Sequence, residues 1–161
     1  MIILNDFNTS VKKALSEIDP YWKDYEGLII CGTHTPHNTE ELIDLIKNAR
    51  ENNIPFLGIC FGHQLACIEY CINVLEIKDA TSEEFGQGTF VIKKLPELNV
   101  GLKDGESYWN NYEIDPVILN QWYKPDNFIT CQYHPEYQSS KDKPHELLVK
   151  FLEICKKRSL S

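Results

Sequence analysis

Residues 56–64, "FLGICFGHQ", decide the fold. The apolar run of residues 54–59 that leads into this stretch is typical of a strand covered on both faces of a sheet. A helical pattern follows at once, and its apolar side is formed by Leu65, Ile68, Cys71 and Ile72. We therefore predict a strand that turns directly into a helix, with Cys60 at the junction.

The same alternation occurs on both sides of this stretch. Strands are predicted at residues 2–4 and 27–31, and amphipathic helices at residues 11–18 and after Asn38, whose side chain is expected to cap its helix. Short strand-like pieces at residues 89–92 and 128–131 alternate with turns from Thr81 to Cys131, and a last helix begins near Pro144. This order predicts a flavodoxin-like, three-layer α/β fold with a central, mostly parallel sheet. We expect a single domain over residues 1–161.

Composition narrows the function classes. The formal net charge of −8 argues against a nucleic-acid partner, which normally requires a basic face. No apolar run is long enough to cross a bilayer, and we expect "MIILNDFN" at the start to be a strand rather than a secretory signal. The six cysteines have no paired spacing, so reduced thiols in a cytoplasmic protein are expected.

Cys60 has two interpretations. A nucleophile on a tight strand-to-helix turn needs small residues two places away on either side, and Gly58 and Gly62 meet that need. The N-terminus of the helix would favour a thiolate, and the backbone N–H of Phe61 could stabilise an oxyanion. On this motif alone, however, a buried cysteine that merely packs in a core is the more frequent case.

A second motif supplies what a nucleophile needs. His134 and Glu136 follow the apolar residues 128–131 and lie two places apart, so in extended chain they point the same way and Glu136 can orient the imidazole. A cysteine, a histidine and a carboxylate together allow thiol attack on an amide. Alone, "HPE" would be read as a surface turn.

The two motifs together resemble the class I glutamine amidotransferases, and most closely the glutaminase domain of CTP synthase. The resemblance covers roughly residues 27–154. It is carried by "FLGICFGHQLA", "LEIKDATSEEF", the "YEI" of residues 112–114 and "QYHPEYQSSKDKPHELLVKFLE".

The resemblance implies an enzyme that hydrolyses the side-chain amide of glutamine and supplies ammonia to a separate synthetase, with no cofactor and no metal. It makes Cys60 the nucleophile, His134 the base and Glu136 the orienting carboxylate. It also implies that the backbone of Phe61 helps to form the oxyanion hole.

The resemblance assigns substrate binding to two further side chains. Gln64, one helical turn after Cys60, would contact the substrate, and Glu84 would take the α-amino group of glutamine. From the residues alone, Gln64 would be assigned to a solvated helix face and Glu84 to a loop.

Two positions depart from the family pattern. A Gly-Gly pair is replaced here by Gly32-Thr33, which alters a second donor of the oxyanion hole, and Asn111 replaces an arginine that helps to bind glutamine. We therefore expect weak activity on free glutamine, rising with a synthetase partner or a larger substrate. Two alternatives stay open: a γ-glutamyl hydrolase acting on an amide conjugate, and a non-enzymatic binding module.

A competing metal site lies in the same region. Cys31, His34 and His37 have residue types that bind zinc, but the spacing suits a loop poorly and no CxxC partner exists. We expect the two histidines to line the mouth of the cleft instead.

Overall fold

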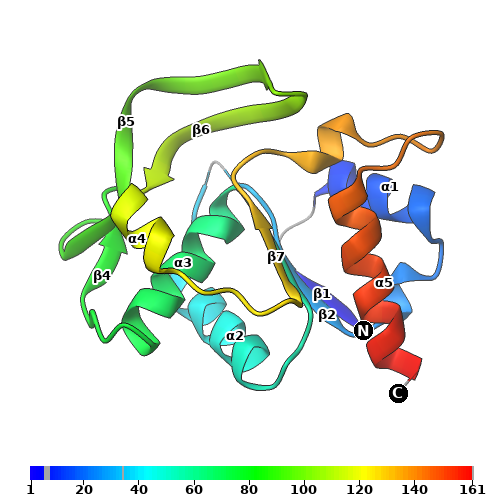
Figure 1. Ribbon diagram of the computed structural model, residues 1–161, viewed down its shortest axis with the longest axis horizontal. Coiled ribbons are helices and arrows are strands. Elements are labelled where there is room, and N and C mark those ends of the chain that lie inside the picture. Colours follow the sequence, from blue (N-terminus) through cyan, green and yellow to red (C-terminus); the bar gives the residue numbers. More distant parts are fainter. Residues whose placement is uncertain (6–7, 34, 161) are drawn as a thin grey trace.

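The computed structural model describes residues 1–5, 8–33 and 35–160 (Figure 1). Its central sheet contains four short strands: β1 (Ile2–Leu4), β2 (Gly27–Ile30), β3 (Phe56–Ile59) and β7 (Phe128–Cys131). They lie in the order β1-β2-β3-β7, and every neighbouring pair is parallel. All residues of β2 and β3 are buried, as expected for parallel strands covered on both faces.

Helices cover both faces of this sheet. Helices α1 (Thr9–Ile18) and α5 (Glu146–Leu160) pack on one face, where the apolar residues of α1 meet those of α5 in one buried cluster. Helices α2 (Thr39–Glu51) and α3 (Phe61–Asn73) pack on the other face (Figure 1). The predicted three-layer α/β fold is therefore confirmed.

The predicted cap of α2 is wrong in one respect. Asn38 does stand at the N-cap position, but its side chain makes no capping hydrogen bond. Its backbone is left-handed, with φ of 55°, whereas a capping residue normally has an extended backbone. Its carbonyl oxygen accepts the N–H of Leu42 instead.

A second sheet stands beside the first. It contains β4 (Ala80–Ser82), β5 (Thr89–Lys103) and β6 (Glu106–Ile114), in the order β4-β5-β6. The long antiparallel hairpin of β5 and β6 forms an arm above α3 and α4 (Pro116–Gln121), as Figure 1 shows. Two 3-10 turns, η1 (Trp22–Asp24) and η2 (Pro135–Gln138), complete the elements.

The hairpin is much longer than the sequence predicted. Only residues 89–92 were expected to form a strand in this part, whereas β5 continues to Lys103. Most residues of β5 after Ile92 are exposed, so burial imposes no alternating apolar pattern on them. The missed signal is the turn dipeptide Asp104-Gly105, whose φ angles of 53° and 81° are both positive, as in a tight two-residue hairpin turn.

The cysteines form no disulfide bonds, as expected from their spacing. All six cysteines are free thiols, and all except Cys60 are buried. Within the described ranges, no helix is long and apolar enough to span a membrane.

The turn between β3 and α3 is tightly packed. The Cα of Gly62 lies against the carbonyl of Ile30, so that an added Cβ would collide with its oxygen. A Cβ on Gly58 would lie 2.9 Å from the carbonyl carbon and oxygen of Gly62. The two glycines therefore let β3, α3 and β2 meet, and they leave Cys60 with a positive φ of 54°.

Replacement of Gly62 by alanine should lower the free energy of unfolding by about 3 kcal/mol, because backbone must move to admit the methyl group. Gly105→Asn is the matched control. It adds a larger side chain where nothing lies within 4 Å, and asparagine tolerates a left-handed backbone, so it should cost less than about 1 kcal/mol. Denaturant unfolding measures both values. Equal stability of the two variants would contradict the packing described.

Candidate active site

The pairing of β3 with β7 brings the two chemical motifs together. Ile59 lies opposite Cys131 in the parallel register, and the backbone N–H of Cys60 donates to the carbonyl of Cys131 at 2.8 Å. Because neighbouring parallel strands end at the same edge of the sheet, Cys60 and His134 leave the sheet side by side. The parallel pairing thus brings the candidate nucleophile and the candidate base to one edge of the sheet.

Cys60 stands at the N-cap position of α3 in a strained conformation, with φ of 54° and ψ of −99°. A non-glycine residue at positive φ is uncommon and stores strain of about 1–3 kcal/mol, a feature that clusters at functional sites. Its side chain is half-buried rather than packed in the core. The Sγ atom lies 3.4 Å from Nε2 of Gln132, which donates to it, and 3.8 Å from the carbonyl oxygen of Trp109.

His134 is held between Cys60 and Glu136. Its Nδ1 lies 3.0 Å from Oε2 of Glu136, and both side chains are buried. A carboxylate accepts, so Nδ1 carries a proton and Nε2 is directed to the other side, where Cys60 lies. The ring also stacks on Tyr137, with centroids 5.1 Å apart.

The charge of His134 is stabilised by these neighbours. Burial alone would lower its pKa, but the hydrogen bonds with Cys60 and Glu136 outweigh burial and raise the pKa from 6.5 to about 10. At neutral pH the imidazole therefore holds a proton that it can give to a leaving group.

Gly32 allows His134 to approach Cys60. A Cβ at this position would lie 2.8 Å from Cε1 of His134 and 3.4 Å from the Cβ of Cys60. A side chain here would therefore push the two apart. Gly32 closely follows the end of β2, so the ends of β2, β3 and β7 all meet at this point.

A cleft of about 810 Å³ opens above Cys60. Every residue assigned from the sequence to catalysis, the oxyanion hole or substrate binding lines it, except Glu136, which lies behind His134. The lining residues come from the segments after the parallel strands, from α3, from the segment after β4, from the hairpin arm and from η2: Asn8, Gly32, Thr33, Cys60, Phe61, Gln64, Glu84, Gly101, Leu102, Ser107, Tyr108, Trp109, Asn110, Asn111, Tyr112, His134 and Tyr137.

Gln64 and Glu84 occupy different environments in the cleft. Gln64 is buried, and its Nε2 donates to the carbonyl of Tyr112 at 3.0 Å and to Oε1 of Gln132 at 3.2 Å. Since Gln132 also donates to Cys60, Gln64 stands at the start of a series of hydrogen bonds that ends at the sulfur. Glu84 is exposed to the cleft, and partial desolvation by its surroundings raises the pKa of its carboxyl group.

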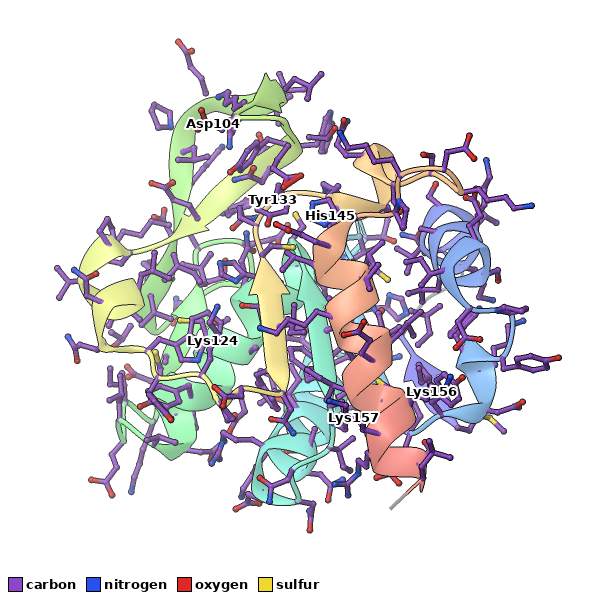
Figure 2. The ribbon with its side chains drawn as sticks, turned by 45° about the vertical axis from the view of Figure 1, so that its right-hand side comes forward. Asp104, Lys124, Tyr133, His145, Lys156 and Lys157 are labelled. Atoms are coloured by element: carbon purple, nitrogen blue, oxygen red, sulfur yellow. The ribbon has the colours of Figure 1, made fainter. Side chains whose placement is uncertain are left out.

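The hairpin arm is hydrogen-bonded to the segment that carries His134. The N–H of His134 donates to the carbonyl of Ser107 at 2.8 Å, and Nε2 of Gln138 donates to the Ser107 hydroxyl at 2.6 Å. Nδ1 of His145 accepts the N–H of Leu147, so its Nε2 carries the proton and donates to Glu106 at 2.9 Å. Figure 2 shows His145 beside Tyr133 near the start of α5, with Asp104 at the far tip of the arm.

Sequence reasoning missed several residues of the site. Gln132 is the most important, because it touches both Gln64 and Cys60. It precedes His134 by two places after a strand, so the same alternation that paired His134 with Glu136 could have found it. Tyr137 and the hairpin residue Trp109 gave no comparable signal, because their positions depend on the folding of η2 and the arm.

The metal alternative gains no support from the described residues. Within residues 1–5, 8–33 and 35–160, no group of three or more histidine, cysteine, aspartate or glutamate side chains could hold a metal ion. His37 contacts the carbonyl of Thr35 at 3.0 Å and borders a small recess beside Thr33 rather than the main cleft. The prediction that His37 lines the cleft mouth is therefore wrong, and His34 lies outside the described residues.

Comparison with known proteins places the protein in a family. The family model of glutamine amidotransferase class-I matches residues 3–121. The protein therefore belongs to the class I glutamine amidotransferases.

Within that family, the protein is similar to CTP synthases. It is 34% identical to the CTP synthase of Methanoculleus marisnigri over 86% of its own length and 35% of the relative, and 31% identical to that of Methanoregula boonei over 83% and 35%. It thus spans about a third of the length of these relatives. Its fold matches a solved glutaminase domain of Trypanosoma brucei CTPS with bound acivicin, at a TM-score of 0.78 and 18% identity, over 97% of its own length and 93% of that domain.

The protonation of His134 gives a test of the site in solution. A nuclear magnetic resonance titration should show His134 releasing its proton near pH 10 in the wild-type protein. Cys60→Ala and Glu136→Gln should each lower this pKa, because each removes an interaction with the charged ring. Cys155→Ala, in α5, should leave it unchanged.

The raised pKa of His134 also predicts how the stability of the protein depends on pH. Since the folded pKa lies above the ordinary value of 6.5, the contribution of His134 is fully present below pH 6.5 and is lost as the pH rises toward about 10. The destabilisation caused by Glu136→Gln should shrink over that range. Titration of wild-type His134 near pH 6.5 would refute the arrangement.

Proposed function

We propose that this protein hydrolyses the side-chain amide of a glutamine substrate through a thioester on Cys60 and releases ammonia. The single observation that carries the proposal is the strained Cys60 at the N-terminus of α3, with the protonated, Glu136-bound His134 beside it over an open cleft. Membership of the class I glutamine amidotransferases supports the same chemistry.

The proposed reaction has two halves. In the first, the sulfur of Cys60 attacks the amide carbon, its thiol proton having passed to His134, and the C–N bond breaks as His134 protonates the leaving nitrogen. In the second, His134 takes a proton from water, the hydroxide attacks the thioester carbon, and the carboxylate product leaves as the thiol is restored.

Backbone and side-chain groups around Cys60 are suited to the charge that develops. Phe61 is the first residue of α3, and the first N–H groups of a helix have no partner within it, so the Phe61 N–H is a candidate donor to the oxyanion. Gly32 and Thr33 lie across the cleft and are candidates for the second donor. The amide of Gln132 already donates a hydrogen bond to the sulfur at 3.4 Å.

The ammonia acceptor is proposed to be a synthetase. The relatives are named CTP synthase, and this protein matches about a third of their length, so the acceptor site would lie outside the residues matched here. Glu84 and Asn111 are proposed to contact the substrate, because both line the cleft.

Cys60→Ala should lower ammonia release at least about 1000-fold, as removal of a catalytic nucleophile does, while the circular dichroism spectrum and unfolding midpoint stay close to those of the wild type. Cys155→Ala, which removes a buried thiol of α5, is the matched control and should retain activity.

Chemical labelling distinguishes an enzyme from a binding module. A diazo-ketone analogue of glutamine should label the wild-type protein on Cys60 and spare the other cysteines, all of which are buried. Full ammonia release by Cys60→Ala would refute the proposed mechanism. Labelling of Cys60 by generic thiol reagents alone would favour one of the two alternatives, a γ-glutamyl hydrolase acting on a conjugate or a binding module.

A further inference from the structure

The charged side chains of the cleft restrict the substrate that it can hold. Among the described residues that line the cleft there is no lysine or arginine. Among the lining residues that the structure describes, the one carboxyl group belongs to Glu84, and the positive charge of His134 is already bonded to Glu136. A carboxylate that enters such a cleft loses water and meets no cation to replace it.

An ammonium group that enters the cleft does find a group of opposite charge. Glu84 lines the cleft with an exposed side chain, so its carboxylate can accept hydrogen bonds from a positively charged amine. The same carboxylate repels a second carboxylate nearby. The overall charge of −8 acts in the same direction at longer range.

The cleft also has room and apolar surface beyond what one free amino acid covers. Its volume of about 810 Å³ falls in the upper part of the range of about 300–1,000 Å³ that is typical of sites for larger ligands. The arm contributes Leu102, Tyr108, Trp109 and Tyr112 to the lining. Leu102 and Trp109 are 67% and 41% exposed, so they offer contact area to a group attached to the glutamine.

We propose that the substrate is a glutamine with a free α-amino group and a neutral, amide-linked α-carboxyl group, as in the N-terminal glutamine of a peptide. This inference rests on the proposed chemistry of Cys60. The C–N bond of the glutamine δ-amide breaks, ammonia leaves, water supplies the oxygen of the new carboxylate, and the peptide bond stays intact. Glu84 binds the α-ammonium group, and the arm contacts the residue that follows.

Two small compounds isolate the charge of the α-carboxyl group: L-glutamine and L-glutamine α-methylamide. Calorimetry with Cys60→Ala measures their binding without turnover. The methylamide should bind at least about 10-fold more tightly. Equal binding, tighter binding of glutamine, or binding of neither compound would overturn the inference.

A change of charge in the cleft should change the preference. Asn111→Arg places a cation on β6 within the cleft lining and should strengthen glutamine binding enough to remove the preference for the methylamide. Glu113→Arg is the matched control, because Glu113 lies on the same strand, is exposed and is outside the lining. The same loss of preference in both variants would contradict an effect of the cleft itself.

Wild-type kinetics separate this inference from the proposed function. Faster release of ammonia from the methylamide than from glutamine supports both. If the methylamide binds preferentially but neither compound is hydrolysed, the substrate inference stands and the Cys60 mechanism fails. If glutamine is hydrolysed with the higher kcat/KM, the inference is overturned while the mechanism stands.

Discussion

The site at the carboxyl ends of the parallel strands depends on the close contact between the Cα of Gly62 and the carbonyl of Ile30. It lets α3 begin against β2 immediately after β3 ends, and the backbone makes that turn with Cys60 at a positive φ. In this strained conformation Cys60 lines the cleft, whereas a cysteine that only packs would lie in the core. The close packing of Gly62 is therefore one reason why Cys60 lies at the cleft and not in the core.

The rest of the site depends on two connections to that turn. Because β7 pairs with β3, Gln132 and His134, which follow β7, lie next to the sulfur of Cys60. Through the Ser107 carbonyl, the backbone of His134 is joined to the hairpin arm. The backbone of His134 and the outer wall of the cleft are therefore held by the same hydrogen bond, so a displacement of the arm would also disturb His134.

The central sheet could be predicted from the sequence because burial on both faces leaves near-continuous apolar runs such as residues 56–59. The side chains proposed for catalysis could be selected because their spacing is local: two glycines around Cys60, and Glu136 two places after His134. The arm could not, since a mostly exposed strand is under little pressure to alternate. For the same reason the cleft wall around Trp109 had no recognisable pattern.

The series of hydrogen bonds from Gln64 through Gln132 to Cys60 marks another limit of sequence reasoning. Gln64 was assigned to the substrate from the resemblance alone, whereas the structure gives its amide nitrogen two protein partners. Such a connection between α3, the segment after β7 and the arm depends on how three separate elements pack. It becomes visible only in three dimensions.

The central claim is that Cys60 forms a covalent bond to the substrate. Its most direct test is acid quenching of the wild-type protein during turnover of L-glutamine α-methylamide or L-glutamine, followed by intact-mass and peptide-mapping mass spectrometry. The account predicts a glutamyl adduct on Cys60 that hydroxylamine removes, as it does a thioester. Ammonia release with no adduct on Cys60, or with an adduct on a different residue, would contradict it.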